Sequence, residues 1–403
     1  MKMQKKYTYI DLFSGCGGLS LGLLNAGWKG LFAVEKNPDA FSTLKYNLIH
    51  KQSHYNWPKW LPVSHHNIDH VLSQYNVELK KLKGFVDLVA GGPPCQGFSV
   101  AGQRKEDDCR NKLIDSYLKF VSFVEPTFIF FENVKGFTLS FGDNAKKGKN
   151  YSDYVIRRLD LLGYNVHGKL VDFSEYGIPQ KRTRFILIGV KKSFGASGDL
   201  AEVFFDKLRQ NRYLLLSLKG LSTEVTLEEA ISDLLESHGT APCPDSEDFK
   251  SGLYSTAQTS YQRYMRCRRQ KNSIPDSHRF VNHSQKIKER FQYAIDNNLG
   301  PKEYQRYFKL SKSGTKKVLR DEPSSTLTTL PDDYIHYQEP RVFTVREFAR
   351  IQSFPDWYEF KGNYTTGGKL RTKQTPRYTQ IGNAIPPLFA EIAGFSLKEM
   401  ASV

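Results

Sequence analysis

The chain reads Val86-Asp-Leu-Val-Ala-Gly-Gly-Pro-Pro-Cys95-Gln-Gly-Phe-Ser99 at the point from which the rest of the fold can be worked out. An apolar run that ends in two glycines is typical of a buried strand leading into a loop. Pro93 and Pro94 stiffen this loop and remove two backbone donors, so the next residue is held in place. That residue is Cys95, a thiol at the carboxyl end of a strand, where open α/β folds place their chemistry. We therefore interpret Cys95 as a nucleophile rather than as a structural core cysteine.

A similar strand-and-loop unit opens the chain. Residues 7–13 are rich in β-branched and aromatic side chains and lead into Ser14-Gly-Cys-Gly-Gly18, after which leucines recur at helical spacing. The glycines allow a ligand to approach the backbone, and the start of the helix offers free N–H groups. A second strand over residues 31–34 ends at Glu35, 20 residues after Gly15. An acid at that distance is placed to accept both hydroxyls of a ribose.

The glycine pattern also indicates which nucleotide is bound. Ser20 occupies the position at which a dinucleotide-binding loop carries its third glycine. This favours an adenosine cofactor without phosphates over a pyrophosphate-bearing dinucleotide, and S-adenosylmethionine fits. A dehydrogenase is the competing interpretation, disfavoured by this serine and by the Pro-Pro-Cys loop.

Two further segments place charged groups beside predicted strands. The apolar strand over residues 127–131 ends at Glu132, and a carboxylate at the end of a buried strand is costly unless it is paired or reactive. We expect Glu132 to act as a proton donor rather than as a helix cap. Arg182 and Arg184 open the strand over residues 185–190, where alternating guanidinium groups can clamp an anionic group. Strands alternate with helices up to about residue 190, which predicts a doubly wound, mostly parallel α/β sheet of the Rossmann-like type.

Composition and charge narrow the class of protein. The chain has 403 residues and a net charge of +16, with no apolar run of membrane-spanning length. Residues 251–320 contain 16 Lys or Arg and 4 Asp or Glu, a local net charge of +12. Such a block fits a nucleic-acid partner, and a solvated surface is an equally good interpretation of the run alone. Within it, residues 261–271 interleave aromatic and basic side chains that could reach bases and phosphates. The basic side chains expected to contact DNA are Arg263, Arg266, Arg268, Arg269 and Lys271.

Cysteine usage predicts a reduced, cytoplasmic protein. The five cysteines are odd in number and scattered, and none forms a pair or cluster with metal-ligand spacing. Three histidines lie close together over residues 65–70, but no cysteine or acidic cluster accompanies them. We therefore predict that no metal is bound.

Taken together, these segments resemble the cytosine-C5 DNA methyltransferases, typically the modification enzymes of bacterial restriction–modification systems. Asp11-Leu-Phe-Ser-Gly-Cys-Gly-Gly18 is similar to the family's cofactor loop, Gly92-Pro-Pro-Cys95-Gln to its nucleophile loop and Glu132-Asn-Val134 to its acid motif. Gln180-Lys-Arg-Thr-Arg184, the segment from Arg346 to Pro355 and Gly382-Asn-Ala384 resemble its later motifs. The six motifs occur in the family's order, and the resemblance covers about residues 7–192 and 320–400.

The resemblance implies roles for individual residues. Phe13 would pack on the adenine, Glu35 would bind the ribose, and Pro94 and Asn383 would line the cofactor pocket beside the loop of Gly15 and Gly17. The family's Gly-Asp-Ile acid, which contacts the adenine amino group, is matched here by His66-Asn67-Ile68, with Asp69 one place further on. Asn67 could accept the same hydrogen bond, so both Asn67 and Asp69 stay candidates. Cys95 would attack C6 of a flipped-out cytosine, Glu132 would hold or protonate N3, and Arg182 and Arg184 would orient the base and the DNA backbone.

The resemblance also implies an organisation and partners. Residues 1–192 with 377–403 would form the catalytic, cofactor-binding domain, and residues 193–376 a smaller DNA-recognition domain whose variable basic part spans about 250–320. S-adenosylmethionine would be converted to S-adenosylhomocysteine, and the substrate would be double-stranded DNA. We expect a monomer in the bacterial cytoplasm, and a cognate restriction endonuclease that acts on the same site without forming a stable complex. A DNA-binding protein with a silent methyltransferase fold is disfavoured because Cys95, Glu132, Arg182 and Arg184 are all present. RNA methylation stays a minor alternative.

Overall fold

The computed structural model describes residues 6–94, 112–139, 151–195, 200–267, 274–310, 315–366 and 374–402. The chain forms two compact units. The first contains Met1–Asp172, Thr183–Leu215 and Phe389–Val403, and the second contains Phe173–Arg182 and Leu216–Leu388. These units are defined by how compactly the chain packs, and their boundaries differ from those of the predicted functional domains, 1–192 with 377–403 and 193–376. That functional division stays a prediction.

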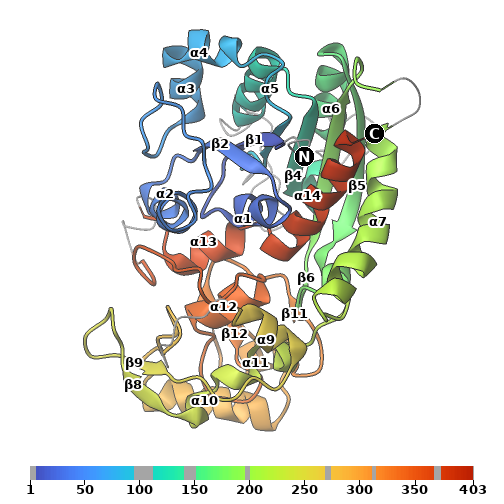
Figure 1. The fold of residues 1–403 in the computed structure, drawn as a ribbon. Helices are drawn as coiled ribbons and strands as arrows, with labels where there is room; N and C mark the ends of the chain where they lie inside the picture. The colour runs from blue at the N-terminus through green and yellow to red at the C-terminus, as the bar shows by residue number, and fades with distance from the viewer. Residues whose placement is uncertain are drawn as a thin grey trace. The chain divides into compact units, whose positions relative to one another are not determined.

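A six-stranded sheet forms the centre of the first unit, with the strand order β2-β1-β3-β4-β7-β5 (Figure 1). The strands are β1 (Thr8–Leu12), β2 (Lys29–Val34), β3 (Leu88–Gly91), β4 (Phe128–Val134), β5 (Tyr164–Asp172) and β7 (Thr183–Lys191). β1 pairs in parallel with β2 and β3, and β3 pairs in parallel with β4, whereas β7 runs antiparallel to β4 and β5. The prediction of an α/β fold with a mostly parallel sheet is confirmed.

Helices cover both faces of this sheet. The described helical segments of the first unit are α1 (Gly18–Asn25), α2 (Pro38–Leu44), the π-helical η1 (Lys45–Lys51), α3 (Ile68–Gln74), α4 (Asn76–Lys81), α5 (Lys112–Val124), the 3-10 turn η3 (Lys135–Thr138) and α6 (Tyr151–Leu161), together with most of α7 (Leu200–Leu218) and of α14 (Pro387–Ala401). α1 and α14 lie on one face, where the indole N–H of Trp28 donates to the carbonyl of Gly394 at 2.8 Å. This contact fastens the C-terminal helix to the N-terminal strand-and-helix unit.

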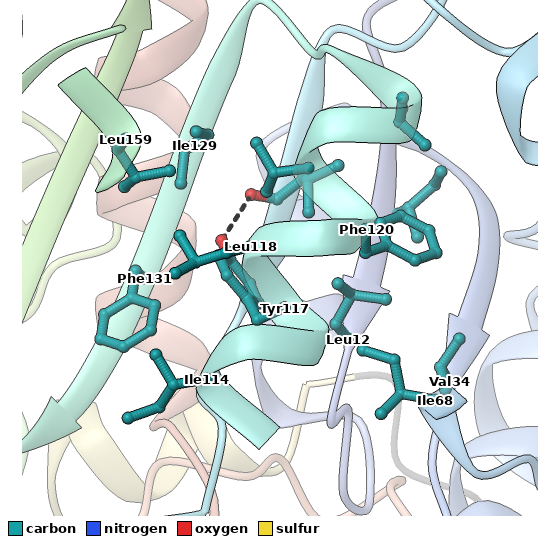
Figure 2. Close-up of a cluster of buried hydrophobic side chains, with 14 of the residues drawn as sticks. Leu12, Val34, Ile68, Ile114, Tyr117, Leu118, Phe120, Ile129, Phe131 and Leu159 are labelled. Carbon is teal, nitrogen blue, oxygen red and sulfur yellow. Dashed lines mark hydrogen bonds between the residues drawn. The ribbon is translucent and has the colours of Figure 1, made fainter. Parts of the chain in front are cut away.

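The main apolar core lies on the opposite face, beneath α5 (Figure 2). Ile114, Tyr117, Leu118 and Phe120 of α5 are buried against β-strand side chains, because the apolar positions of this helix recur on one side. The strand side chains beneath them include Leu12, Val34, Ile129 and Phe131. Since side chains alternate across a strand, Asp11 lies on the other face from Leu12, towards α1. The core therefore fixes β1, β3 and β4, which carry the candidate site at their carboxyl ends.

Local signals in the sequence explain several element boundaries. Asn37 caps α2 by accepting the N–H groups of Asp39 and Ala40 at 2.9 and 3.0 Å, and Pro38 occupies the first helical position, where its fixed φ and missing N–H suit the start of a helix. The end of β4 differs from the prediction. The strand continues past Glu132 to Val134, because its antiparallel partner β7 pairs with it as far as Arg184.

The second unit contains short strands and helices. Its strands are β6 (Gln180–Lys181), β8 (Thr240–Pro242), β9 (Lys250–Gly252), β10 (Lys316–Lys317), β11 (Ser324–Ser325) and β12 (Tyr334–Ile335). Its helices are α8 (Leu227–Ile231), α9 (Ser260–Met265), α10 (Gln285–Asp296), α11 (Pro301–Tyr307), α12 (Val345–Ile351) and α13 (Arg377–Asn383), with 3-10 turns η4 (Phe173–Tyr176), η5 (Ser232–Leu234), η6 (Glu236–His238) and η7 (Pro331–Asp333).

Buried ion pairs hold this unit around α12. The fully buried guanidinium of Arg350 contacts Asp233 at 2.6 Å and Asp356 at 2.7 Å. Burial opposes the ionisation of Asp356, but the neighbouring Arg350 and Arg346 outweigh it and hold the pKa of this carboxyl below its usual range. The unit therefore depends on charged groups that must stay paired.

Candidate active site

The predicted cofactor loop is a tight turn between β1 and α1. Phe13 lies in the left-handed backbone region at φ 58°, and Gly15 and Gly17 follow at 54° and 92°. The N–H of Gly17 donates to the carbonyl of Ser14 at 3.0 Å, which closes the turn. A non-glycine residue in this region stores strain and persists only where its surroundings fix it. The turn therefore presents the Phe13 side chain, which is partly exposed, next to the start of a helix.

Glu35 joins this loop to the end of β2. Its carboxylate accepts the N–H of Gly15 at 2.9 Å and the N–H of Asn37 at 2.7 Å. Burial raises the pKa of Glu35, and these backbone donors oppose the shift. Each carboxylate oxygen has a second lone pair, so the same group can also accept ribose hydroxyls.

Asn67 lies beside Glu35, because the N–H of His66 donates to the Glu35 carbonyl at 2.7 Å. Asn67 caps α3 by accepting the N–H of Asp69 at 2.8 Å. The carboxylate of Asp69 is engaged elsewhere, since it accepts the hydroxyl of Ser116 on α5 at 2.5 Å. The structure thus groups Phe13, Glu35 and Asn67 and turns Asp69 towards α5.

The strand that leads to Cys95 can approach its neighbours only because it ends in glycines. A Cβ on Gly91 would lie 2.3 Å from the carbonyl oxygen of Leu12, and a Cβ on Gly92 would lie 2.8 Å from Oε2 of Glu132. Pro94 is exposed, and Cys95 itself lies outside the described residues. The loop towards the predicted nucleophile therefore starts in direct contact with the predicted acid.

Glu132 is paired with Arg184 across β4 and β7. Nε of Arg184 lies 3.1 Å from Oε1 of Glu132, and the two side chains are 13% and 15% exposed. Burial lowers the pKa of Arg184, while the carboxylate beside it opposes that shift. A guanidinium stays protonated in proteins, so Glu132 has a permanent cationic neighbour. The structure thus places these two candidate residues side by side.

Asn133 is a residue that the sequence reasoning missed. Its buried side-chain amide donates to the carbonyl of Pro93 at 3.2 Å, so it ties β4 to the start of the nucleophile loop. The available signal was a carboxamide directly after Glu132 in an otherwise apolar strand, since a buried amide normally has a partner.

The remaining predicted site residues belong to the second unit or lie outside the described residues. Arg182 is buried and donates to the carbonyl of Leu327 at 3.4 Å, and Asn383 is exposed at the end of α13. Arg263 is exposed, whereas Arg266 forms an ion pair with Asp233 and donates to the carbonyl of Ser255 at 2.7 Å. The other predicted DNA contacts, Arg268, Arg269 and Lys271, lie outside the described residues.

Metal clusters and membrane-spanning helices are both absent from the part of the chain that the structure describes. Within the described ranges, no group of three or more His, Cys, Asp or Glu side chains is arranged to hold a metal ion. No helix in the same part of the chain has the length and apolar character needed to cross a membrane.

Known proteins match this chain over nearly its whole length. The model of the family described as C-5 cytosine-specific DNA methylase matches residues 7–399. The type II methyltransferase M.DdeI of Desulfomicrobium norvegicum is 32% identical over 405 residues, which cover 95% of this chain and 86% of the relative. The type II methyltransferase M.XorII of Xanthomonas oryzae is 30% identical over 404 residues, which cover 96% of this chain and 83% of the relative.

Solved structures share the fold. A putative DNA modification methyltransferase encoded within an E. coli prophage superposes with a TM-score of 0.67 at 25% identity, over 99% of this chain and 100% of the other. The Dnmt2 methyltransferase of S. pombe gives a TM-score of 0.53 at 15% identity, over 98% of this chain and 99% of the other, and supports the fold alone. The family match and the two type II relatives show that this chain belongs to the C-5 cytosine-specific DNA methylase family, as an S-adenosylmethionine-dependent DNA cytosine-5-methyltransferase.

Proposed function

We propose that this enzyme methylates C5 of a cytosine within a specific double-stranded DNA sequence through a covalent bond from Cys95 to C6. The observation that carries the proposal is the placement of Glu132. Its carboxylate is paired with Arg184 and lies against Gly92, three residues before Cys95. An acid beside the loop that bears the nucleophile is the arrangement that this chemistry needs.

Cytosine C5 is a poor nucleophile until the ring is activated. The Cys95 thiolate would form a bond to C6 while Glu132 holds or protonates N3, so that the electron pair of the C5–C6 double bond becomes available at C5. After C5 takes the methyl group, a base removes the C5 proton, the double bond re-forms and the thiolate leaves. A free thiol has a pKa of about 8.5, so the site must favour the thiolate. Arg184, and Arg182 with it, would orient the base and stabilise the developing charge.

The cofactor site fits an adenosine ligand without phosphates. Phe13 offers an aromatic face, Glu35 offers acceptors for the ribose, and the backbone of Gly15 and Gly17 allows close approach. We place Asn67 on the adenine edge, because its carbonyl oxygen has a second lone pair and Asp69 is bonded to Ser116. The family resemblance also assigns cofactor contacts to Pro94 and to Asn383. S-adenosylmethionine, when bound, supplies a methyl group activated by the sulfonium.

The substrate must leave the helix stack before this chemistry can occur. A stacked cytosine does not expose C6 to a thiolate, so we propose that the target base is flipped out. The basic part of residues 250–320 would bind the phosphates of the duplex, with Arg263 and the segment of Arg268, Arg269 and Lys271 as candidates. Arg266 is a weaker candidate because its guanidinium is already paired with Asp233. Cytoplasmic location, a monomeric state, the absence of a metal and a cognate endonuclease stay predictions.

Bisulfite sequencing tests the proposal directly. Mixed-sequence DNA is incubated with the full chain and S-adenosylmethionine, and protected cytosines should fall within one short recognition sequence. The Cys95→Ala variant should still bind DNA and cofactor but protect no cytosine. Protection of cytosines by that variant would overturn the role of Cys95 as the nucleophile. Methylation of RNA but not of DNA would overturn the assignment of double-stranded DNA as the substrate.

A further inference from the structure

A chain of buried hydroxyl groups lies beneath the cofactor loop, on the α1 face of the sheet. Ser20 of α1 donates to Oδ2 of Asp11 at the end of β1, and its oxygen lies 2.6 Å from the hydroxyl of Tyr55. Because the single Ser20 proton is used on Asp11, the Tyr55 hydroxyl is the donor to Ser20. All three side chains are at least nine-tenths buried.

Tyr55 comes from an irregular segment, His54–Leu61, which we call the edge segment. Tyr55 forms a β-bridge to Gly30 of β2, and the N–H of Asn56 donates to the Gly30 carbonyl at 2.8 Å. A Cβ on Gly30 would lie 2.4 Å from the Tyr55 ring, so the glycine is what allows this approach. The backbone of the edge segment thus places the Tyr55 hydroxyl in the interior of the first unit.

The Ser20–Asp11 bond closes the cofactor loop at its base. Asp11 precedes the turn and Ser20 follows it in the first turn of α1, so the bond spans the strained residue Phe13 and the two positive-φ glycines. The other Asp11 oxygen, Oδ1, is buried and has no hydrogen-bond partner among the described residues. Ser20 is therefore the one described donor to this carboxylate, and Tyr55 is the group that orients Ser20.

We infer that Tyr55 is a positioning residue of the cofactor site, acting through Ser20 and Asp11 to hold the Phe13–Gly17 turn in the form that receives S-adenosylmethionine. The inference rests on the proposed cofactor function of this turn. A strained turn persists only where several surrounding contacts hold it in place. The hydrogen-bonded series from Tyr55 through Ser20 to Asp11 is one of these contacts.

The carboxylate at the end of the chain makes the constraint sensitive to pH. Burial raises the pKa of Asp11 to about 7, and the negative charge of Glu35 adds to this shift, while the Ser20 hydrogen bond opposes it. Tyr9 on the same strand and Tyr55 also face this charge, and Tyr117 of α5 interacts with it electrostatically from the other side of the sheet. All three keep their protons, because burial raises their pKa values above the usual range. Burial lowers the pKa of His54, whose Nε2 lies 2.7 Å from the Tyr9 hydroxyl, to about 3, so this imidazole is neutral.

The sign of the pH effect follows from the charge of the acceptor. A hydrogen bond to an ionised carboxylate is stronger than one to its neutral form. If the ionised form of Asp11 holds the turn, cofactor affinity rises with pH through about 7. Removal of the Tyr55 hydroxyl weakens Ser20 as a donor, so ionised Asp11 is less favoured and the midpoint moves to higher pH.

Calorimetric titration with S-adenosylhomocysteine between about pH 6 and 9 tests the inference on the full chain. Tyr55→Phe should weaken binding about five-fold at neutral pH, the scale of one hydrogen bond, and should shift the midpoint upwards. In steady-state assays the KM for S-adenosylmethionine should rise while kcat stays unchanged. Tyr7→Phe is the matched control, because Tyr7 is buried beside the same strand and donates to Ala401 at 2.8 Å, away from the turn.

A double-mutant cycle separates positioning from a general loss of stability. In the Ser20→Ala background, Tyr55→Phe should have almost no further effect on affinity, because the connection is already broken. Additive losses, an unshifted pH midpoint or equal losses in Tyr7→Phe would overturn the inference. If Tyr55→Phe does not fold, Ser20→Ala alone must show the affinity loss and the shifted midpoint. Failure of the unaltered chain to bind S-adenosylhomocysteine would instead overturn the proposed cofactor function itself.

Discussion

At the level of single residues, the contact between Glu132 and Arg184 is the one on which the proposed chemistry depends. Glu132→Gln keeps the shape of the side chain but removes its charge and its proton-transfer capacity. We expect methyl transfer to slow by about 10²–10⁴-fold, the usual contribution of a positioned acid or base, with cofactor affinity unchanged. Single-turnover rates with radiolabelled S-adenosylmethionine measure this. A variant within about two-fold of the parent rate would rule out Glu132 as the acid.

Asn133 should matter for the nucleophile loop in a different way. Asn133→Ala removes the donor to the Pro93 carbonyl at 3.2 Å and leaves that buried acceptor without it. Loss of a buried partner costs about 1–3 kcal/mol, so we expect a lower unfolding free energy together with slower methyl transfer. Urea unfolding and activity assays check both effects. Asn165→Ala, on an exposed position of β5, is the control and should change neither quantity.

At the level of elements, the Gly91-Gly92 turn sets how closely β3 approaches its neighbours. Gly92→Ala would place a methyl group 2.8 Å from Oε2 and 2.9 Å from the carbonyl oxygen of Glu132. The backbone of Glu132 cannot move aside as a flexible side chain can, so the loop that leads to Cys95 must move instead. A displacement of about 1 Å at a reacting group can lower the rate by about 10²-fold. Gly220→Ala, where no atom lies within 4 Å of the added Cβ, should lower stability but leave the rate unchanged.

The elements also show what the sequence can predict. The start of α2 follows from Asn37 and Pro38, because caps act through neighbours in the chain. Glu35 and Glu132 could be predicted because the carboxyl ends of parallel strands gather at one edge of a sheet. Arg184 lies at the start of β7, which runs antiparallel to β4, and was predicted instead from the alternating guanidinium groups there. Tyr55 and Asn133 were not predicted, since each acts through a partner 35 or 40 residues away that only the folded chain brings close. The choice between Asn67 and Asp69 likewise depends on Ser116, which lies on another helix.

At the level of the whole molecule, the net charge of +16 predicts how DNA binding responds to salt. A protein with several phosphate contacts loses about 10³–10⁵ in affinity between about 50 and about 200 mM salt, through counterion release. We expect a loss of at least about 10²-fold for this enzyme, measured by fluorescence anisotropy on a labelled duplex. Cofactor affinity should change little over the same range. A flat salt response would contradict binding through the basic segment.

The stability of the second unit should decrease at acidic pH. The pKa of Asp356 is depressed in the folded state, so its contribution to stability is present above its unfolded pKa of about 3.9 and is lost as the pH falls through the folded value. Urea unfolding between about pH 3 and pH 7 should show this loss at the acid end. Arg350→Ala leaves Asp233 and Asp356 buried without their shared cation and should cost about 3–5 kcal/mol at neutral pH. A smaller loss than that of an exposed variant such as Arg209→Ala would contradict this account.

The bridge between Gly30 and Tyr55 has a consequence for self-association. An unpaired outer strand is a template on which another chain can add a strand and start to aggregate. β2 is the outer strand at one side of the sheet, and the edge segment occupies part of its free side. Gly30→Val would push Tyr55 away and reopen that side. Such a variant should therefore precipitate more readily at high concentration than its loss of stability alone would predict.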